Sequence, residues 1–278
     1  MIKYVIIGFL ALLQVVNVFN YEAKQNLRIH FLDIGQGDSI LIRTPDKINI
    51  LIDGGPDASV IDNLGRVMPF YENNIHYVIA THGDADHIAG LIDVFERFNV
   101  ENFIYNGESK NTILFDRLLE LVELEKSNII FVDSKADQVI GCCLSIDFLW
   151  PLNGFDEHID SNDNSVAFIA TYDNFDIYLG GDLSSKYEIQ SLQRISKNIE
   201  IHKAGHHGSK TSSSIDFLNL INPELTIISV GENNKFNHPD PNLLKNLKNL
   251  KIDYLRTDLN GIISLYSDGE AYYIETEK

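Results

Sequence analysis

The 278-residue chain has few cysteines, prolines and positive charges, and each shortage excludes a class of protein. Cys142 and Cys143 are adjacent, so they provide neither a disulfide framework nor zinc-finger spacing. We expect both to pack in a strand over 142–150, without a redox role. The 22 lysines and arginines against 40 aspartates and glutamates give a net charge of −18, which argues against a general basic face for duplex DNA. The 7 prolines form no linker, so one compact domain over 26–278 is predicted.

Long hydrophobic runs are also scarce, and the one exception lies at the N-terminus. Lys3 precedes an apolar run over residues 4–19, slightly short of the ~20 residues that span a bilayer. The run is typical of a secretory signal, but no small-residue cleavage site follows it. We interpret residues 1–20 as a signal peptide or an N-terminal membrane anchor, with 4–19 as the possible tether. Either interpretation predicts an extracytoplasmic protein, secreted or anchored to the outer face of the cytoplasmic membrane.

From residue 26 onward, short apolar segments alternate with helical patterns, which predicts layered α/β packing with helices covering the sheets. The expected strands are 27–32, 39–44, 48–52, 77–81, 144–149, 166–172, 176–179, 199–204, 226–230 and 261–267. The expected helices are 88–97, 112–125, 185–197, 213–220 and 241–249.

Potential metal ligands follow three of these strands. The loop after residues 77–80 reads Thr-His-Gly-Asp-Ala-Asp-His, and its ligand-type residues are His82, Asp84, Asp86 and His87. Asp182 follows two glycines after another strand, and His206 and His207 follow a third. The ends of strands are where α/β sheets build their sites, and imidazole with carboxylate suits Zn²⁺ or Mn²⁺. The sequence therefore predicts a divalent metal centre.

The loop resembles the HxHxDH signature of the metallo-β-lactamase superfamily, with Asp84 in place of the second histidine. Further blocks resemble the hydrolase domain of ComEC-type competence proteins, in a freestanding form without the channel region. These blocks are HFLDIGQGDS at 30–39, LIDGG at 51–55, NDNSV at 162–166, GHHGS at 205–209 and His238-Pro239. The resemblance implies an αββα sandwich of two mixed β-sheets flanked by helices, with the metal centre on one edge.

The resemblance also implies roles for the ligand-type residues. Asp86, His87 and Asp182 would hold one ion with one imidazole from His206 or His207, and His82 with Asp84 would hold a second. Neighbouring side chains diverge on a strand, so we expect only one of the two to ligate and the other to contact substrate or act as a general acid. Spacing leaves open which one ligates; we place His206 with the metal and His207 with catalysis. The third histidine motif of other members is missing, and Asp163 and Asn164 occupy about its place; we expect Asn164 to orient a ligand or touch substrate. One ion and two ions both stay open.

Metal-bound water would supply the nucleophile, oriented by Asp84 or Asp86. The loop after the two histidines offers phosphate contacts through Lys210, Ser209 and Thr211, of which Lys210 is also a catalytic candidate. Further residues expected to orient ligands or to touch substrate are Asp38 and His238, on the rim, and Asp53, which is expected to hydrogen-bond a ligating imidazole.

Three functions fit this set. The first is an extracytoplasmic metal-dependent phosphodiesterase, a nuclease acting on DNA, with single-stranded DNA as the candidate partner. The second is hydrolysis of another ester or small phosphodiester, such as a phosphorylcholine-type substrate. The third, a metal-binding protein without turnover, is disfavoured because such donor sets concentrate at functional sites. No protein partner can be inferred.

Overall fold

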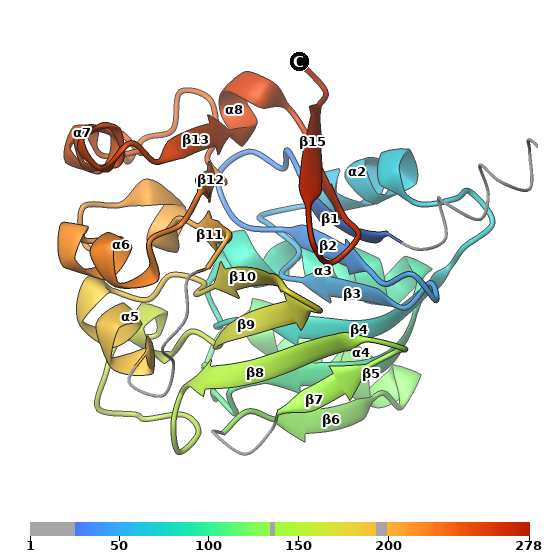
Figure 1. Ribbon diagram of the computed structural model, residues 1–278. Coiled ribbons are helices and arrows are strands. Elements are labelled where there is room, and N and C mark those ends of the chain that lie inside the picture. Colours follow the sequence, from blue (N-terminus) through green and yellow to red (C-terminus); the bar gives the residue numbers. More distant parts are fainter. Residues whose placement is uncertain (1–25, 134–136, 193–198) are drawn as a thin grey trace, which may run out of the picture.

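The computed structural model describes residues 26–133, 137–192 and 199–278, and these residues form two stacked sheets with helices on their outer sides (Figure 1). The residues interpreted as a signal or anchor, 1–20, lie outside the described ranges. No helix in the described ranges has the length and apolar composition needed to cross a membrane.

The first sheet has eight strands in the described residues, in the order β15-β14-β1-β2-β3-β4-β5-β6. Their bounds are β1 Leu27–Phe31, β2 Ile40–Arg43, β3 Asn49–Ile52, β4 Asn74–Ala80, β5 Asn99–Tyr105, β6 Asn128–Phe131, β14 Ile263–Ser267 and β15 Tyr272–Thr276. The pairs from β3 to β6 are parallel and the others are antiparallel, so the sheet is mixed.

The second sheet has seven strands in the described residues, in the order β13-β12-β11-β10-β9-β8-β7. Their bounds are β7 Gln138–Ile140, β8 Leu144–Trp150, β9 Ala167–Tyr172, β10 Phe175–Leu179, β11 Ile201–Lys203, β12 Leu225–Ile228 and β13 Asp253–Arg256. This sheet is also mixed, because β10 to β13 pair in parallel and β7 to β10 pair antiparallel.

Helices cover the outer face of each sheet (Figure 1). Their bounds are α2 Ser59–Val67, α3 Ala85–Arg97, α4 Ile113–Glu125, α5 Ser185–Ser191, α6 Ile215–Ile221, α7 Pro241–Leu250 and α8 Thr257–Asn260. The first three helices bury residues such as Leu64, Leu91 and Leu118 against the first sheet, and Phe217 of α6 packs on the second. A separate apolar cluster that includes Phe31, Phe168 and Ile201 fills the space between the sheets. The predicted αββα sandwich is thus confirmed.

Two local predictions are corrected. Cys142 and Cys143 do not lie on a strand: they occupy the turn between β7 and β8, and the structure joins them in a disulfide. Adjacent side chains point to opposite faces only in extended backbone, and in this turn the two cysteines do not. The sequence also missed the short elements α2, β5, β6, β7, β13, β15 and α8, several of which have exposed residues that blur the apolar pattern.

Candidate metal centre

Strands β4, β10 and β11 each lead directly into a segment that carries ligand-type residues. After β4 the chain makes a short loop, and Asp84 lies just before α3 in extended conformation. Asp86 and His87 follow in the first turn of α3. The strand fixes the start of this loop and the helix fixes its end. The positions of the ligand-type residues in between are therefore fixed by their spacing along the chain.

Asp182 lies at the middle of the centre. Its Oδ2 atom is 3.3 Å from Nε2 of His87, 3.4 Å from Nε2 of His207 and 3.6 Å from Nε2 of His206. Gly181, in left-handed backbone with φ of 53°, brings it there; a Cβ at this position would lie 2.8 Å from Cβ of Ser165. Residues far apart in the sequence therefore converge on one carboxylate.

The two consecutive histidines both face Asp182, which corrects the expectation that they diverge. Instead of continuing β11, His206 and His207 have φ values of 48° and 54° in the left-handed region. Such backbone is uncommon for residues other than glycine and often marks a functional site. His207 is fully buried, whereas the His206 side chain is 29% exposed. His207, which we had placed with substrate, is the more enclosed of the two.

Two buried imidazoles of the centre, those of His87 and His207, each have a carboxylate behind them. His87 Nδ1 lies 2.7 Å from Asp53 Oδ2, which gives the expected contact of Asp53 with an imidazole. His207 Nδ1 lies 3.3 Å from Asp38 Oδ1. Such contacts fix the ring and leave Nε2 free to bind a metal. Asp38 is thus buried behind His207, not on the rim, because Gly37 lets its loop approach the backbone of Asp86.

The charges of the centre depend on one another. Burial by itself lowers the pKa of His87, but Asp182 and Asp53 raise it well above the ordinary value. In His207 burial is likewise outweighed, and Asp182 and Asp38 raise its pKa to about 9. Burial would raise the pKa of Asp182, but the two imidazoles hold it well below its usual range. The carboxylates are therefore stabilised in the charged form, and positive charge, on an imidazole or on a bound cation, is stabilised between them.

This donor set fits a divalent metal. Asp38, His87, Asp182 and His207 are buried, and each offers a ligand atom within 4.8 Å of the others. Among the described residues, the buried polar atoms without a hydrogen-bond partner include Nε2 of His82, His87 and His207 and Oδ1 of Asp182. Orphaned buried polar atoms are rare in proteins unless something binds them. Imidazole nitrogen and carboxylate oxygen are ligands suited to Zn²⁺ or Mn²⁺.

The geometry separates two halves of this centre. Nε2 of His87 and His207 and Oδ2 of Asp182 and Asp86 lie together, with 3.5 Å from His207 to Asp86. Asp38 belongs behind this half, since it faces the opposite nitrogen of His207. In the other half, His82 Nε2 is 4.0 Å from Asp84 Oδ2. Both halves could hold an ion, so one or two ions remain consistent with the residues.

Two lysines that the sequence analysis did not select lie against these carboxylates. Lys203, the last residue of β11, is 1% exposed, forms an ion pair with Asp38 and lies 3.9 Å from Asp182. Lys110 forms an ion pair with Asp84. The available signal for Lys203 was a charged residue within an otherwise buried strand that runs into the ligand loop. Lys110 lies 26 residues from Asp84, and no spacing rule connects them.

Of the remaining predicted residues, Thr211 and His238 lie beside His206, the partly exposed imidazole of the centre, and Asn164 does not face the centre. Thr211 Oγ1 lies 3.5 Å from His206 Nδ1, and the His238 ring lies 5.8 Å from the His206 ring. Lys210 is exposed on the same loop, and Ser209 Oγ lies 3.0 Å from Thr211 Oγ1.

Asn164 differs, because its side-chain amide bonds the backbone of residues 156, 159 and 160. The neighbouring Ser165 faces the centre instead, with Oγ 3.3 Å from His82 Nδ1. Asn164 therefore organises its own loop, and Ser165 was missed because a serine beside an asparagine gives no ligand signal.

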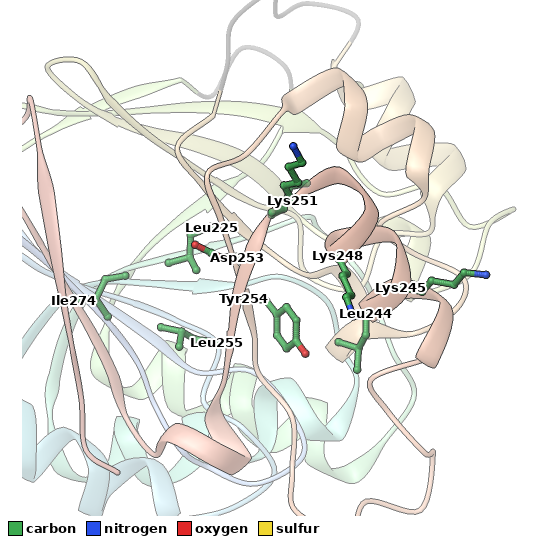
Figure 2. A pocket seen from close by; sticks show the side chains of 10 residues that line it. Leu225, Leu244, Lys245, Lys248, Lys251, Asp253, Tyr254, Leu255 and Ile274 are labelled. Carbon is green, nitrogen blue, oxygen red and sulfur yellow. The ribbon is translucent and has the colours of Figure 1, made fainter.

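The hollow in Figure 2 lies elsewhere, between α7, β13 and β15. Its volume is about 820 Å³, and its lining includes Leu244, Lys248, Tyr254, Leu255 and Ile274. None of the metal-ligand candidates lines it. The chemistry of this chain is thus built at the strand ends and not in this hollow.

Comparison with known proteins agrees with the site. The model of the metallo-β-lactamase superfamily matches residues 32–232. The chain belongs to this superfamily. Its ligand candidates from Asp38 to His207 all fall within the matched range, and the centre described above is that of a metal-dependent hydrolase of this superfamily.

Within this superfamily, the chain is similar to three curated proteins. The chain is 28% identical to ComE operon protein 3 of Bacillus subtilis over 84% of its length, and 27% identical to competence protein ComA of Neisseria gonorrhoeae over 83%. It is 26% identical to recombination protein 2 of Haemophilus influenzae over 91%. The match covers only 32%, 31% and 30% of those proteins, so the chain spans about a third of their length.

Solved structures agree on the fold. CmlA, a diiron β-hydroxylase from Streptomyces venezuelae, superposes with a TM-score of 0.58 at 12% identity, over 87% of this chain and 54% of CmlA. Tm1679, a metal-dependent hydrolase of the beta-lactamase superfamily, gives 0.52 at 14% identity, over 83% and 95%. One fold thus carries hydroxylation and hydrolysis, so the reaction must be argued from the site.

Proposed function

We propose that this protein is an extracytoplasmic, metal-dependent phosphodiesterase that cleaves single-stranded DNA, in a role related to competence. The observation that supports it most is the convergence of unpartnered imidazole and carboxylate atoms on Asp182, in a chain similar to competence proteins over most of its length. Two of the relatives are a competence protein and a recombination protein, and we take DNA as the substrate that suits such a role. Residues 1–20, as a signal peptide or an anchor, would bring the domain outside the cytoplasm.

The chain's own residues would prepare the reaction. A bound Zn²⁺ or Mn²⁺ would supply hydroxide at neutral pH and withdraw charge from a phosphoryl oxygen. Asp53 and Asp38 hold the rings of His87 and His207 through Nδ1, so that both Nε2 atoms stay directed at Asp182. Asp86, which is partly exposed, would accept a hydrogen bond from an attacking water.

The net charge of −18 does not oppose this function. Metal ions provide the positive charge where a phosphate must lie, so no general basic surface is needed for turnover. Lys210, exposed on the loop after the histidines, would add a local cation for the phosphate. We expect low affinity for long DNA and contacts restricted to the nucleotides around the cleaved bond.

The full chain, incubated with Mn²⁺ or Zn²⁺ and labelled single-stranded DNA, tests the proposal. We expect cleavage that EDTA abolishes, together with hydrolysis of bis(p-nitrophenyl) phosphate. Hydrolysis of the small diester alone would reject the nuclease and favour the second candidate, a phosphorylcholine-type or other small-ester hydrolase. Lys210→Ala should weaken turnover of phosphodiesters more than that of a neutral ester, and equal effects would remove its phosphate role.

A further inference from the structure

An exposed aromatic ring extends the metal centre toward solvent. The ring of Phe236 is stacked on that of His238, with centroids 5.8 Å apart and planes at 17°. The His238 ring meets that of His206 edge to face at 5.8 Å, and His206 Nε2 lies 3.6 Å from Asp182. Three rings thus form a continuous series from the central carboxylate to the surface.

The loop that carries these rings has a defined shape. The Asn234 side chain donates to the carbonyl oxygens of Gly231 and His238 and accepts from the His238 N–H at 2.9 Å. Asn233 and Asn237, on either side, have φ values of 54° and 58°, which asparagine tolerates better than most residues. The position of Phe236 is therefore set by the loop and not by packing in a core.

Phe236 remains 51% exposed although burial would stabilise its apolar ring. Beside it, the Lys235 ammonium lies 5.0 Å from the ring centroid, on an exposed and rotatable side chain. An aromatic face next to a lysine is the pairing with which proteins hold single-stranded nucleic acids: the ring stacks on a base and the ammonium pairs with a phosphate. Lys235 can turn from the ring to a phosphate when a base takes its place.

We propose that Phe236, supported by His238, is a stacking platform for the nucleobase next to the cleaved phosphate, and that Lys235 contacts the adjoining backbone. This inference rests on the proposed function and specifies its substrate. Every base has a flat face, so the platform is tolerant of sequence. A paired base hides its faces within the duplex, so the platform selects single strands.

The test uses the full chain and two fluorescent 12-nucleotide strands, oligo(dT) and a strand of equal length with abasic sites. Binding is measured by fluorescence anisotropy in EDTA, and kcat and KM are measured with Mn²⁺. Phe236→Ala should weaken oligo(dT) binding and raise KM roughly 5- to 100-fold, because base stacking is worth that much, while the abasic strand is unaffected. Phe236→Tyr keeps a ring and should behave as wild type.

Phe70→Ala is the matched control, since Phe70 is 99% exposed, follows α2 and has its ring against that of Tyr71. The platform is overturned if wild type binds oligo(dT) no better than the abasic strand. It is also overturned if Phe236→Ala affects both strands equally or neither. If binding depends on Phe236 but no strand is cleaved, the platform is supported and the nuclease proposal fails. If oligo(dT) is cleaved and Phe236→Ala changes neither binding nor cleavage, the nuclease proposal is supported and the platform fails.

Discussion

Two buried polar clusters lie on opposite faces of β11 and differ in how their polar atoms are satisfied. Lys203 points into the metal centre, whereas its neighbour His202 points to the other face, as expected for consecutive strand residues. Behind the sheet, His202 Nδ1 lies 3.3 Å from Thr226 Oγ1 and Nε2 lies 3.4 Å from Ser213 Oγ. Glu188 accepts the Ser213 N–H at 2.6 Å. We call His202, Glu188, Ser213 and Thr226 the rear cluster.

The difference indicates the role of each cluster. The side chains of the rear cluster all have partners in the described residues, so this cluster can exist without a ligand and stabilise the fold. In the metal centre, several buried nitrogen and oxygen atoms have ion-pair contacts but no hydrogen bond in the described residues. A buried polar atom without a hydrogen bond costs roughly 1–3 kcal/mol. A bound cation would therefore stabilise the metal centre more than the rear cluster. Burial of titratable groups alone therefore does not mark an active site. Buried polar atoms that meet at one point without hydrogen bonds do.

The strongest test of this contrast is Asp182→Asn. Three imidazoles approach this carboxylate, so we expect metal affinity to fall by more than roughly 100-fold, beyond the loss typical of outer partners, and hydrolysis to disappear. Metal content after dialysis measures the first effect, and turnover of bis(p-nitrophenyl) phosphate measures the second. Circular dichroism should show an unchanged fold. Full metal content in this variant would refute the assignment of the centre.

The converse test is His202→Ala in the rear cluster. The substitution leaves a cavity and removes the imidazole partner of the Thr226 hydroxyl group, whereas Ser213 keeps its bonds to Gly205 and Glu188, so the free energy of unfolding should fall by roughly 2–4 kcal/mol. Metal content of the folded protein should not change. Urea denaturation and metal analysis decide between the clusters. Loss of metal without loss of stability would show that the two clusters are not separate in function.

The last expected effect concerns pH, and it is the smallest when taken per pH unit. Burial raises the pKa of Glu188 to about 8, above its ordinary 4.5. A raised carboxyl pKa means that the folded state binds more protons, so this group's contribution to stability is present below pH 4.5 and declines until about pH 8. Glu188→Gln removes the decline, and its stability relative to wild type should rise by roughly 1 kcal/mol per pH unit across that window.

Urea midpoints at several pH values measure this difference, and exposed Glu123→Gln controls for the lost charge. If the midpoints of Glu188→Gln and wild type run parallel from pH 5 to 8, Glu188 does not titrate in that window. The rear cluster would then not bind its proton as described.

Much of the fold and the site could be predicted from the sequence. The apolar strands before His82, Asp182 and His206 end at almost the expected residues, since buried strands need continuous apolar side chains. Edge strands such as β13 were missed because exposed residues break that pattern. The burial of Asp38 was also missed, since it depends on the close approach of Gly37 to the distant Asp86 backbone.

The sequence alone determined which residue types stand at the strand ends, because local hydrophobic pattern and motif spacing are properties of neighbouring residues. Only the tertiary structure decided which imidazole is enclosed, which carboxylates orient rings and which lysines neutralise them. Left-handed backbone at His206 and His207 turns both rings toward Asp182, and contacts such as Lys110 with Asp84 join segments that no local pattern relates. The sequence therefore identified candidate residues, and contacts between distant segments decided what each of them does.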